Sequence, residues 1–214
     1  TCRSCDKHFL GTMDRPNHTM LVGSVRNPFD WYVSLYSFGV EGHGQLAEVM
    51  RSNYLEPDSD ILDRSNSSKT TVERFRAWMR VLFEGHGRDD ASIIAAAQKR
   101  KVGLMTYRFG SLYSKSSTAM VPHFDYFLRT EHLRETMVDM FLKHAAERGR
   151  SDLDAARVRD ALQGHIEHAN ASPRAEKTAQ AYYDKHTRRL VRRGDAMLLK
   201  MFGYDIHDDE PPSA

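Results

Sequence analysis

The side chains with the clearest chemical potential are an arginine and a serine, Arg26 and Ser34, which stand eight positions apart. A guanidinium presents a planar fork of N–H donors that matches a phosphate or a carboxylate. A serine hydroxyl on an otherwise apolar helix face needs a hydrogen-bond partner. An anion held between the two groups would satisfy both, which predicts a phosphate-binding site. An alternative stays open, in which Arg26 pairs with Asp30 and Ser34 donates to the Asp30 carbonyl oxygen.

Histidines on either side of this segment are candidates for a general base. An imidazole suits that role because its ordinary pKa of about 6.5 lies near neutral pH. His18 abuts a predicted strand, and His43 lies between two glycines in an expected loop. His8, further upstream, is the third candidate.

A strand, a turn and a helix are predicted to position this pair. Residues 20–25 are short and apolar, which is typical of a buried strand. Asn27 suits a helix N-cap, Pro28 suits the first helical position, and Asp30 places a carboxylate in the first turn. The apolar face predicted for this helix consists of Trp31, Leu35 and Phe38.

The rest of the chain is predicted to be mostly helical. Apolar residues spaced by three and four predict a helix over 72–82, and the aromatic, alternating stretch 124–129 predicts a second strand. Residues 56–69 are expected to form an exposed loop. Further helices are predicted at 42–51, 104–113, 130–147, 152–168 and 178–201. This pattern indicates an α/β fold with a small, mostly parallel sheet, in which ligands bind at the carboxyl ends of the strands.

Composition predicts one domain over residues 1–207. The chain has 214 residues, 40% of them hydrophobic, and its acidic tail 208–214 is expected to be disordered. Its 31 basic and 29 acidic residues give a net charge of +2, which disfavours nucleic acid as a partner. Apolar runs are too short to cross a membrane, which predicts a soluble chain without a transmembrane segment.

The two cysteines, Cys2 and Cys5, exclude a disulfide framework and fit a reducing compartment, so we expect a cytoplasmic protein. A zinc site formed with His8 is the alternative. A single C-x-x-C pair is weak support for it, and we predict no metal.

Three stretches in order resemble sulfotransferases that use 3′-phosphoadenosine 5′-phosphosulfate (PAPS). VRNPFDWYVSLYSF, residues 25–38, resembles their 3′-phosphate-binding segment, and DYFLRTEHL, residues 125–133, resembles a strand-to-helix segment. Residues 170–205 resemble the carboxyl-terminal signature of the bacterial and Golgi-type carbohydrate branch. Together the resemblance covers the chain from about residue 5 to residue 205.

This resemblance implies a P-loop, nucleotide-kinase-like fold of three layers, with many helices around the small sheet. It also implies an enzyme that moves a sulfuryl group from PAPS to a hydroxyl or amine of a carbohydrate or small-molecule acceptor. Such an enzyme would align donor and acceptor and neutralise charge on the leaving group. PAPS would be its co-substrate, and no metal would be required.

Site roles follow from the same resemblance. Arg26 and Ser34 would be the 3′-phosphate ligands, and Ser172 and Arg174 would lie in a segment that closes over the cofactor. Asp6-Lys7-His8 resembles a Gly-Lys-His stretch of bacterial relatives, which makes His8 the preferred base.

One departure from the family concerns the loop that holds the 5′-phosphosulfate. No apolar strand followed by a loop with Lys and Ser/Thr occurs here, and we expect it upstream of Thr1. Because this loop does not occur in the sequence, an alternative hypothesis is a catalytically silent, sulfotransferase-like protein that binds nucleotide or glycan. A nucleotide kinase on a related fold is a third hypothesis. The acceptor and the oligomeric state are not predicted, although loops over 39–70 and 84–103 are expected to line an acceptor cleft.

Overall fold

The computed structural model describes residues 20–56, 59–63, 69–87, 92–113, 124–150, 152–162 and 178–204. Contacts divide the chain into two compact units, each built from two segments. The first, which we call the sheet unit, comprises Thr1–Arg26 and Phe109–Ala169. The second, the helical unit, comprises Asn27–Arg108 and Asn170–Ala214. The tail predicted at 208–214 lies outside the described residues.

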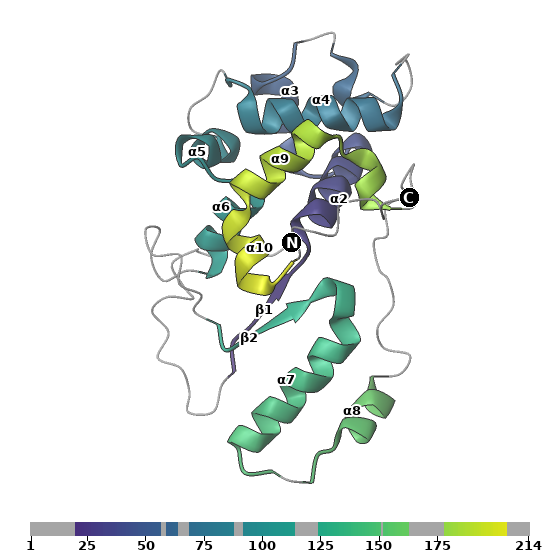
Figure 1. The fold of residues 1–214 in the computed structure, drawn as a ribbon, viewed down its shortest axis with the longest axis vertical. Coiled ribbons are helices and arrows are strands. Elements are labelled where there is room, and N and C mark those ends of the chain that lie inside the picture. Colours follow the sequence, from purple (N-terminus) through teal and green to yellow (C-terminus); the bar gives the residue numbers. More distant parts are fainter. Residues whose placement is uncertain are drawn as a thin grey trace. The chain divides into compact units, whose positions relative to one another are not determined.

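Two parallel strands form the core of the sheet unit (Figure 1). They are β1, Val22–Val25, and β2, Tyr126–Arg129. The first residue of β1 pairs with the first residue of β2, and the last pairs with the last. Both predicted strands are therefore confirmed. The prediction that β1 is a buried strand holds only in part, because exposed and buried residues alternate along it. One face of this short strand remains open, as alternating strands allow.

Helices and aromatic rings cover the sheet. The 3₁₀ turn η2, Thr130–His132, leads from β2 into α7, Leu133–Glu147, and α8, Ala155–Ala161, follows. The end of α6, Leu104–Tyr113, contributes to a cluster of rings with centroids 4.7 to 5.6 Å apart. This aromatic cluster consists of Phe109, Tyr113, Phe124 and Phe127.

The helical unit begins with α2, Pro28–Val40. As predicted, Asn27 caps it, because its Oδ1 accepts a hydrogen bond from the Phe29 N–H at 3.0 Å, and proline occupies the first turn. The predicted apolar face is wrong: the helix buries Tyr32, Val33 and Tyr36, while Phe38 is 43% exposed. A tyrosine can be fully buried when its hydroxyl finds a partner, which hydrophobicity alone does not anticipate.

Two short elements precede α4, Thr71–Glu84, in the chain, and a third follows it. They are α3, Gln45–Asn53; η1, Asp60–Leu62; and α5, Ile93–Lys99. A capping box between Thr70 and Glu73 starts α4, and its predicted apolar face is buried. The expected exposed loop at 56–69 contains η1, whose Leu62 is buried. Helix α3 confirms the helix predicted at 42–51, whereas α5, within the range 84–103 expected to be a loop, was not predicted.

The chain predicted as one helix over 178–201 is broken into three elements. These are η3, Ala179–Tyr182; α9, Lys185–Gly194; and α10, Ala196–Phe202. Asp184 caps α9 through the Thr187 N–H, which starts a new helix there. Gly203 ends α10 with a φ of 60°, the left-handed conformation that glycine adopts without strain.

The α/β class is therefore confirmed at a coarse level. The described residues are mostly helical and contain a parallel sheet of two strands. Within these residues, no helix is both long enough and apolar enough to span a membrane.

Candidate functional site

The carboxyl ends of β1 and β2 meet at one edge of the sheet unit. Val25 pairs with Arg129 in the parallel register, so Arg26 leaves the sheet next to the point where β2 continues into η2. Glu131 and His132 of η2 are exposed, and Arg26 is half-buried. Ligands of parallel sheets bind at such an edge. This edge is the candidate site, and Arg26 lies at it as predicted.

The Arg26 side chain forms no hydrogen bond or ion pair with any residue that the structure describes. The alternative pairing with Asp30 therefore does not form. A half-buried guanidinium has five N–H donors to satisfy, and this one presents them without a protein partner in the described ranges. An anionic ligand is the chemical partner that it fits best.

Ser34 lies two helical turns inside α2, in the helical unit, and is half-buried. Its hydroxyl likewise has no hydrogen-bond partner within the described part of the chain, so the alternative, a bond back to the Asp30 carbonyl oxygen, is absent. Arg26 belongs to the sheet unit, and Ser34 belongs to the helical unit, which begins at Asn27. Within the described residues, neither of the two predicted phosphate ligands has a side-chain partner.

The start of α2 offers little further anion binding through its backbone. Pro28 has no N–H, and the Phe29 N–H already donates to the Asn27 side chain. The Trp31 N–H donates to the Asn27 carbonyl oxygen at 2.9 Å. A phosphate at this turn would therefore be held mainly by side chains and not by the backbone.

The remaining predicted site residues are His8, Ser172 and Arg174, and they lie outside the described residues, as does His18. His43 is exposed in the turn between α2 and α3, as expected of a loop residue, and its ring lies 5.1 Å from that of Phe38. The sequence reasoning missed His132 as a candidate base. Its position directly after the second strand was the available signal, since parallel strands bring such residues to the same edge.

Comparison with protein-family models, with curated proteins and with solved structures finds no match to this chain. The site must therefore be judged on its own geometry. Among the described residues, no group of three or more His, Cys, Asp or Glu side chains is arranged to hold a metal ion.

A second cluster of interacting polar groups lies deep in the helical unit around Asp195. This residue has no exposed surface, and its two carboxylate oxygens accept hydrogen bonds of 2.8 Å from the Tyr32 hydroxyl and the Thr106 N–H. The Met105 N–H donates to the Tyr32 oxygen at 3.3 Å. A Cβ at Gly103 would collide with the carboxylate, so only glycine allows this close approach.

Burial dominates the electrostatics of this cluster. It raises the pKa of Asp195 to about 6, although hydrogen bonds from Thr106 and Tyr32 act in the opposite direction. Burial and the charge of Asp195 also raise the pKa of Tyr32 well above its ordinary value. Perturbed groups often mark active sites, but this cluster is closed to solvent and its oxygens are engaged. We assign it a structural role that joins the α9–α10 corner to α2 and α6.

Arg74 of α4 is a buried cation that the sequence did not single out. It is 4% exposed, its Nε and Nη1 have no hydrogen-bond partner among the described residues, and its Nη2 reaches Thr71 Oγ1 only at 3.4 Å. Burial raises the pKa of the neighbouring Tyr36 to about 12, and the charge of Arg74 opposes that rise. The charge of Arg74 is therefore poorly compensated in the described structure.

Replacing Arg74 by methionine is expected to increase the free energy of unfolding by about 1 kcal/mol, because methionine keeps the apolar stem and removes the buried charge. Urea denaturation of the full chain measures this difference. The matched control is Arg76→Met on the same helix, which removes the donor of the 2.9 Å bond to the Tyr182 carbonyl oxygen and should destabilise. A loss of stability in Arg74→Met would contradict the expectation.

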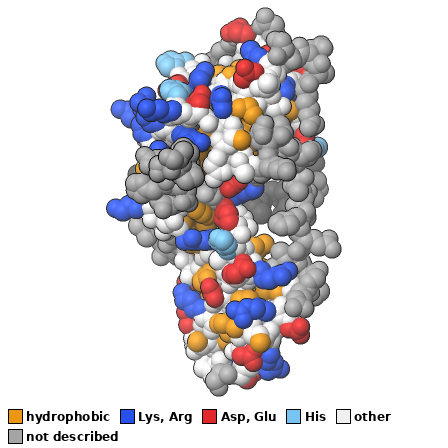
Figure 2. Space-filling model, turned by 45° about the vertical axis from the view of Figure 1, so that its right-hand side comes forward, with side chains coloured by type: hydrophobic (Ala, Val, Ile, Leu, Met, Phe, Trp, Pro, Cys, Tyr) orange, Lys and Arg blue, Asp and Glu red, His pale blue; other side chains and the backbone are white. Residues whose placement is uncertain are grey.

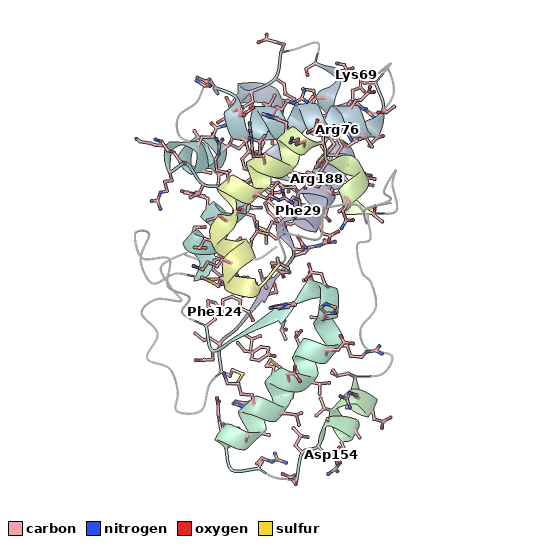
Figure 3. All side chains as sticks on the ribbon, viewed as in Figure 1. Phe29, Lys69, Arg76, Phe124, Asp154 and Arg188 are labelled. Carbon is pink, nitrogen blue, oxygen red and sulfur yellow. The ribbon has the colours of Figure 1, made fainter. Side chains whose placement is uncertain are left out.

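The basic residues of α9 serve partly to hold the helical unit together. Arg188 of α9 and Arg76 of α4, both labelled in Figure 3, donate to carbonyl oxygens of η3. Other basic side chains of α9 are exposed: Lys185, Arg189 and Arg193. On the face seen in Figure 2, basic and acidic side chains are interspersed.

Proposed function

We propose that this protein is a sulfotransferase that moves a sulfuryl group from PAPS to a hydroxyl or amine of a carbohydrate or small-molecule acceptor. One observation carries the proposal. Arg26, which has no side-chain partner among the described residues, leaves the carboxyl end of a parallel strand, and Ser34, likewise without a partner in these residues, lies on the helix that follows. A nucleotide-kinase-like arrangement of three layers and a cytoplasmic location belong to the same proposal.

The proposed reaction gives a different role to each candidate residue. Bound PAPS would supply a sulfuryl group whose bond to the 5′-phosphate oxygen breaks as its sulfur bonds to the acceptor oxygen or nitrogen. Arg26 would neutralise the 3′-phosphate by charge-assisted hydrogen bonds, and Ser34 would donate one more. A histidine would take the acceptor proton. His8 is our preferred base, and the exposed His132 at the sheet edge is the second candidate.

Binding of 3′-phosphoadenosine 5′-phosphate (PAP) tests the proposed ligands. Arg26→Ala is expected to weaken PAP binding by about 1.5 to 3 kcal/mol, because it removes a charge-assisted contact to the 3′-phosphate. Titration calorimetry on the full-length protein measures the dissociation constant. Adenosine 5′-phosphate, which lacks the 3′-phosphate, should bind with similar affinity to wild type and variant.

Arg51→Ala provides the control, because Arg51 is exposed on α3. Its substitution removes the same charge as Arg26→Ala does, but from another element. Its PAP affinity should equal that of wild type. If wild type binds no PAP, or if Arg26→Ala and Arg51→Ala weaken it equally, the assignment of Arg26 fails.

The alternative is a catalytically silent protein that binds nucleotide or glycan on a sulfotransferase-like fold. One observation favours it: neither described strand leads into a loop with Lys and Ser/Thr. β1 continues into Arg26-Asn27-Pro28, and β2 continues into η2. Transfer of labelled sulfate from PAPS to a panel of glycans and phenols separates the two functions, since the silent protein binds PAP without any transfer.

A further inference from the structure

The outer face of α9 is basic along its whole length. Lys185, Arg189 and Arg193 stand four positions apart, so they form a row in which neighbours lie about 6 Å apart. All three are exposed, and none forms an ion pair with a residue that the structure describes. The opposite face of the helix is buried around Leu190 and Val191, so the row faces outward from the helical unit (Figure 1).

The carboxylates near this row in the described structure are buried or already engaged. From the start of α9 to the end of α10 the sequence contains a single acidic residue, Asp195, which is fully buried. Asp184 caps α9 and accepts a hydrogen bond from Arg80 at 3.2 Å. Glu84 lies 3.1 Å from the His186 ring nitrogen. The positive potential of the row is therefore little compensated.

Two more exposed cations come from the connection between α5 and α6. The Gly103 N–H donates to the Gly194 carbonyl oxygen at 2.8 Å, so this connection lies against the C-terminal end of α9. Lys99 and Lys101 are exposed there, and neither has an ion pair in the described ranges. Together with the row on α9 they form what we call the basic surface.

Lys101 adopts a backbone conformation that disfavours lysine. Its φ is 57°, in the left-handed region. Helix α5 ends here in a Schellman motif, because the Lys101 N–H donates to the Gln98 carbonyl oxygen at 2.8 Å and the Val102 N–H donates to the Ala97 carbonyl oxygen at 3.1 Å. Glycine is the usual residue at this position, since a Cβ is strained there. A lysine where glycine would be more stable points to a role for its charge.

We propose that the basic surface docks the protein onto an anionic lipid membrane. Each lysine or arginine near such a membrane adds attraction, and clusters of about four to eight are typical of binding to acidic lipids. Lipids diffuse in the plane of the membrane, so their headgroups can gather beneath cations whose spacing the fold fixes. This inference does not rest on the sulfotransferase function, because the basic surface contains no predicted PAPS ligand and lies in the helical unit.

A lipid surface suits these residues better than a nucleic acid strand does. Proteins that bind single strands combine basic side chains with aromatic rings on which the bases stack. The segments that form the basic surface, α9 and residues 99–103, contain no Phe, Tyr or Trp. The cations lie on the outside of a helix and on a connection beside it, an arrangement that fits an extended surface.

Co-sedimentation of the full-length protein with vesicles tests this docking. Phosphatidylcholine vesicles in which about a third of the lipid is phosphatidylserine should bind the protein, and vesicles of phosphatidylcholine alone should not. Salt screens exposed charges, so binding should weaken as the ionic strength rises. Lys185→Gln, Arg189→Gln and Arg193→Gln combined should weaken binding about hundredfold, since each charge near the membrane contributes about a fivefold factor.

A matched triple variant controls for net charge. Arg51→Gln, Arg134→Gln and Arg159→Gln remove three exposed cations from α3, α7 and α8. This variant should bind acidic vesicles as wild type does. Circular dichroism checks that both triple variants fold.

Lys101→Gly separates the role of the charge from that of the backbone. Glycine relieves the strained conformation, so the variant should unfold at a higher urea concentration than wild type while binding acidic vesicles about fivefold more weakly. A lysine with a structural role alone would leave vesicle binding unchanged. The proposal is overturned if wild type does not bind acidic vesicles, if it binds neutral ones equally, if the two triple variants weaken binding equally, or if Lys101→Gly binds as wild type does. Binding of single-stranded DNA or of a sulfated polysaccharide in place of acidic vesicles would likewise overturn it.

Discussion

Replacing Asp195 by alanine is expected to lower the free energy of unfolding of the helical unit by about 3 to 5 kcal/mol. The substitution removes the acceptor of both the Tyr32 hydroxyl and the Thr106 N–H, in a place without solvent access. Each orphaned buried donor costs about 1 to 3 kcal/mol, and the cavity adds to that loss. Urea denaturation followed by tryptophan fluorescence measures the effect, since both tryptophans lie in this unit.

Two variants separate hydrogen bonding from a general effect of losing a carboxylate. Asp195→Asn keeps an oxygen for the Thr106 N–H and gains an amide that donates to the Tyr32 oxygen, so it should retain most of the stability. Asp160→Ala removes an exposed carboxylate on α8 and should change stability by less than about 0.5 kcal/mol. An Asp195→Ala protein with the unfolding midpoint of wild type would show that the cluster does not hold the unit together.

Local features of the fold were predictable because they depend on neighbours in sequence. The cap at Asn27, the proline that follows it and the capping box at Thr70 act within a single turn. The two strands were recognisable from short apolar or aromatic runs, and the parallel pairing followed from helices between them. Arg26 could therefore be placed at the edge of a sheet before its partner strand was known.

Features that depend on distant partners were not predictable in this way. Tyr32 is buried because its hydroxyl reaches Asp195, which lies 163 positions away. The break between α9 and α10 falls at this same aspartate, directly after Gly194, and the tertiary contacts of Asp195 hold it there. His132 had a signal in the sequence, its position after the second strand, but the pairing of that strand's end with the end of β1 comes from the strand register.

The contribution of Asp195 to the free energy of unfolding should fall by about 3 kcal/mol as the pH rises from about 4 to about 6. Burial holds the pKa of this carboxyl at about 6 in the folded chain, against an ordinary value of 3.8 when unfolded. Between these values the folded state binds the proton and the unfolded state has lost it, so rising pH favours unfolding. A difference of about two pKa units corresponds to about 3 kcal/mol.

Asp195→Asn isolates this contribution, because the variant has no proton to lose at that position. Hydrogen bonds from Thr70 and Arg150 lower the pKa values of the exposed carboxyls of Glu73 and Asp152, respectively. As the pH rises, these carboxyls therefore change stability in the opposite direction from Asp195. Their effects are the same in both proteins and cancel in the difference. Urea denaturation of wild type and Asp195→Asn at pH 4, 5, 6 and 7 should show the variant gaining relative to wild type as the pH rises. A difference that stays constant over this range would mean that Asp195 ionises in the folded chain as it does in the unfolded one.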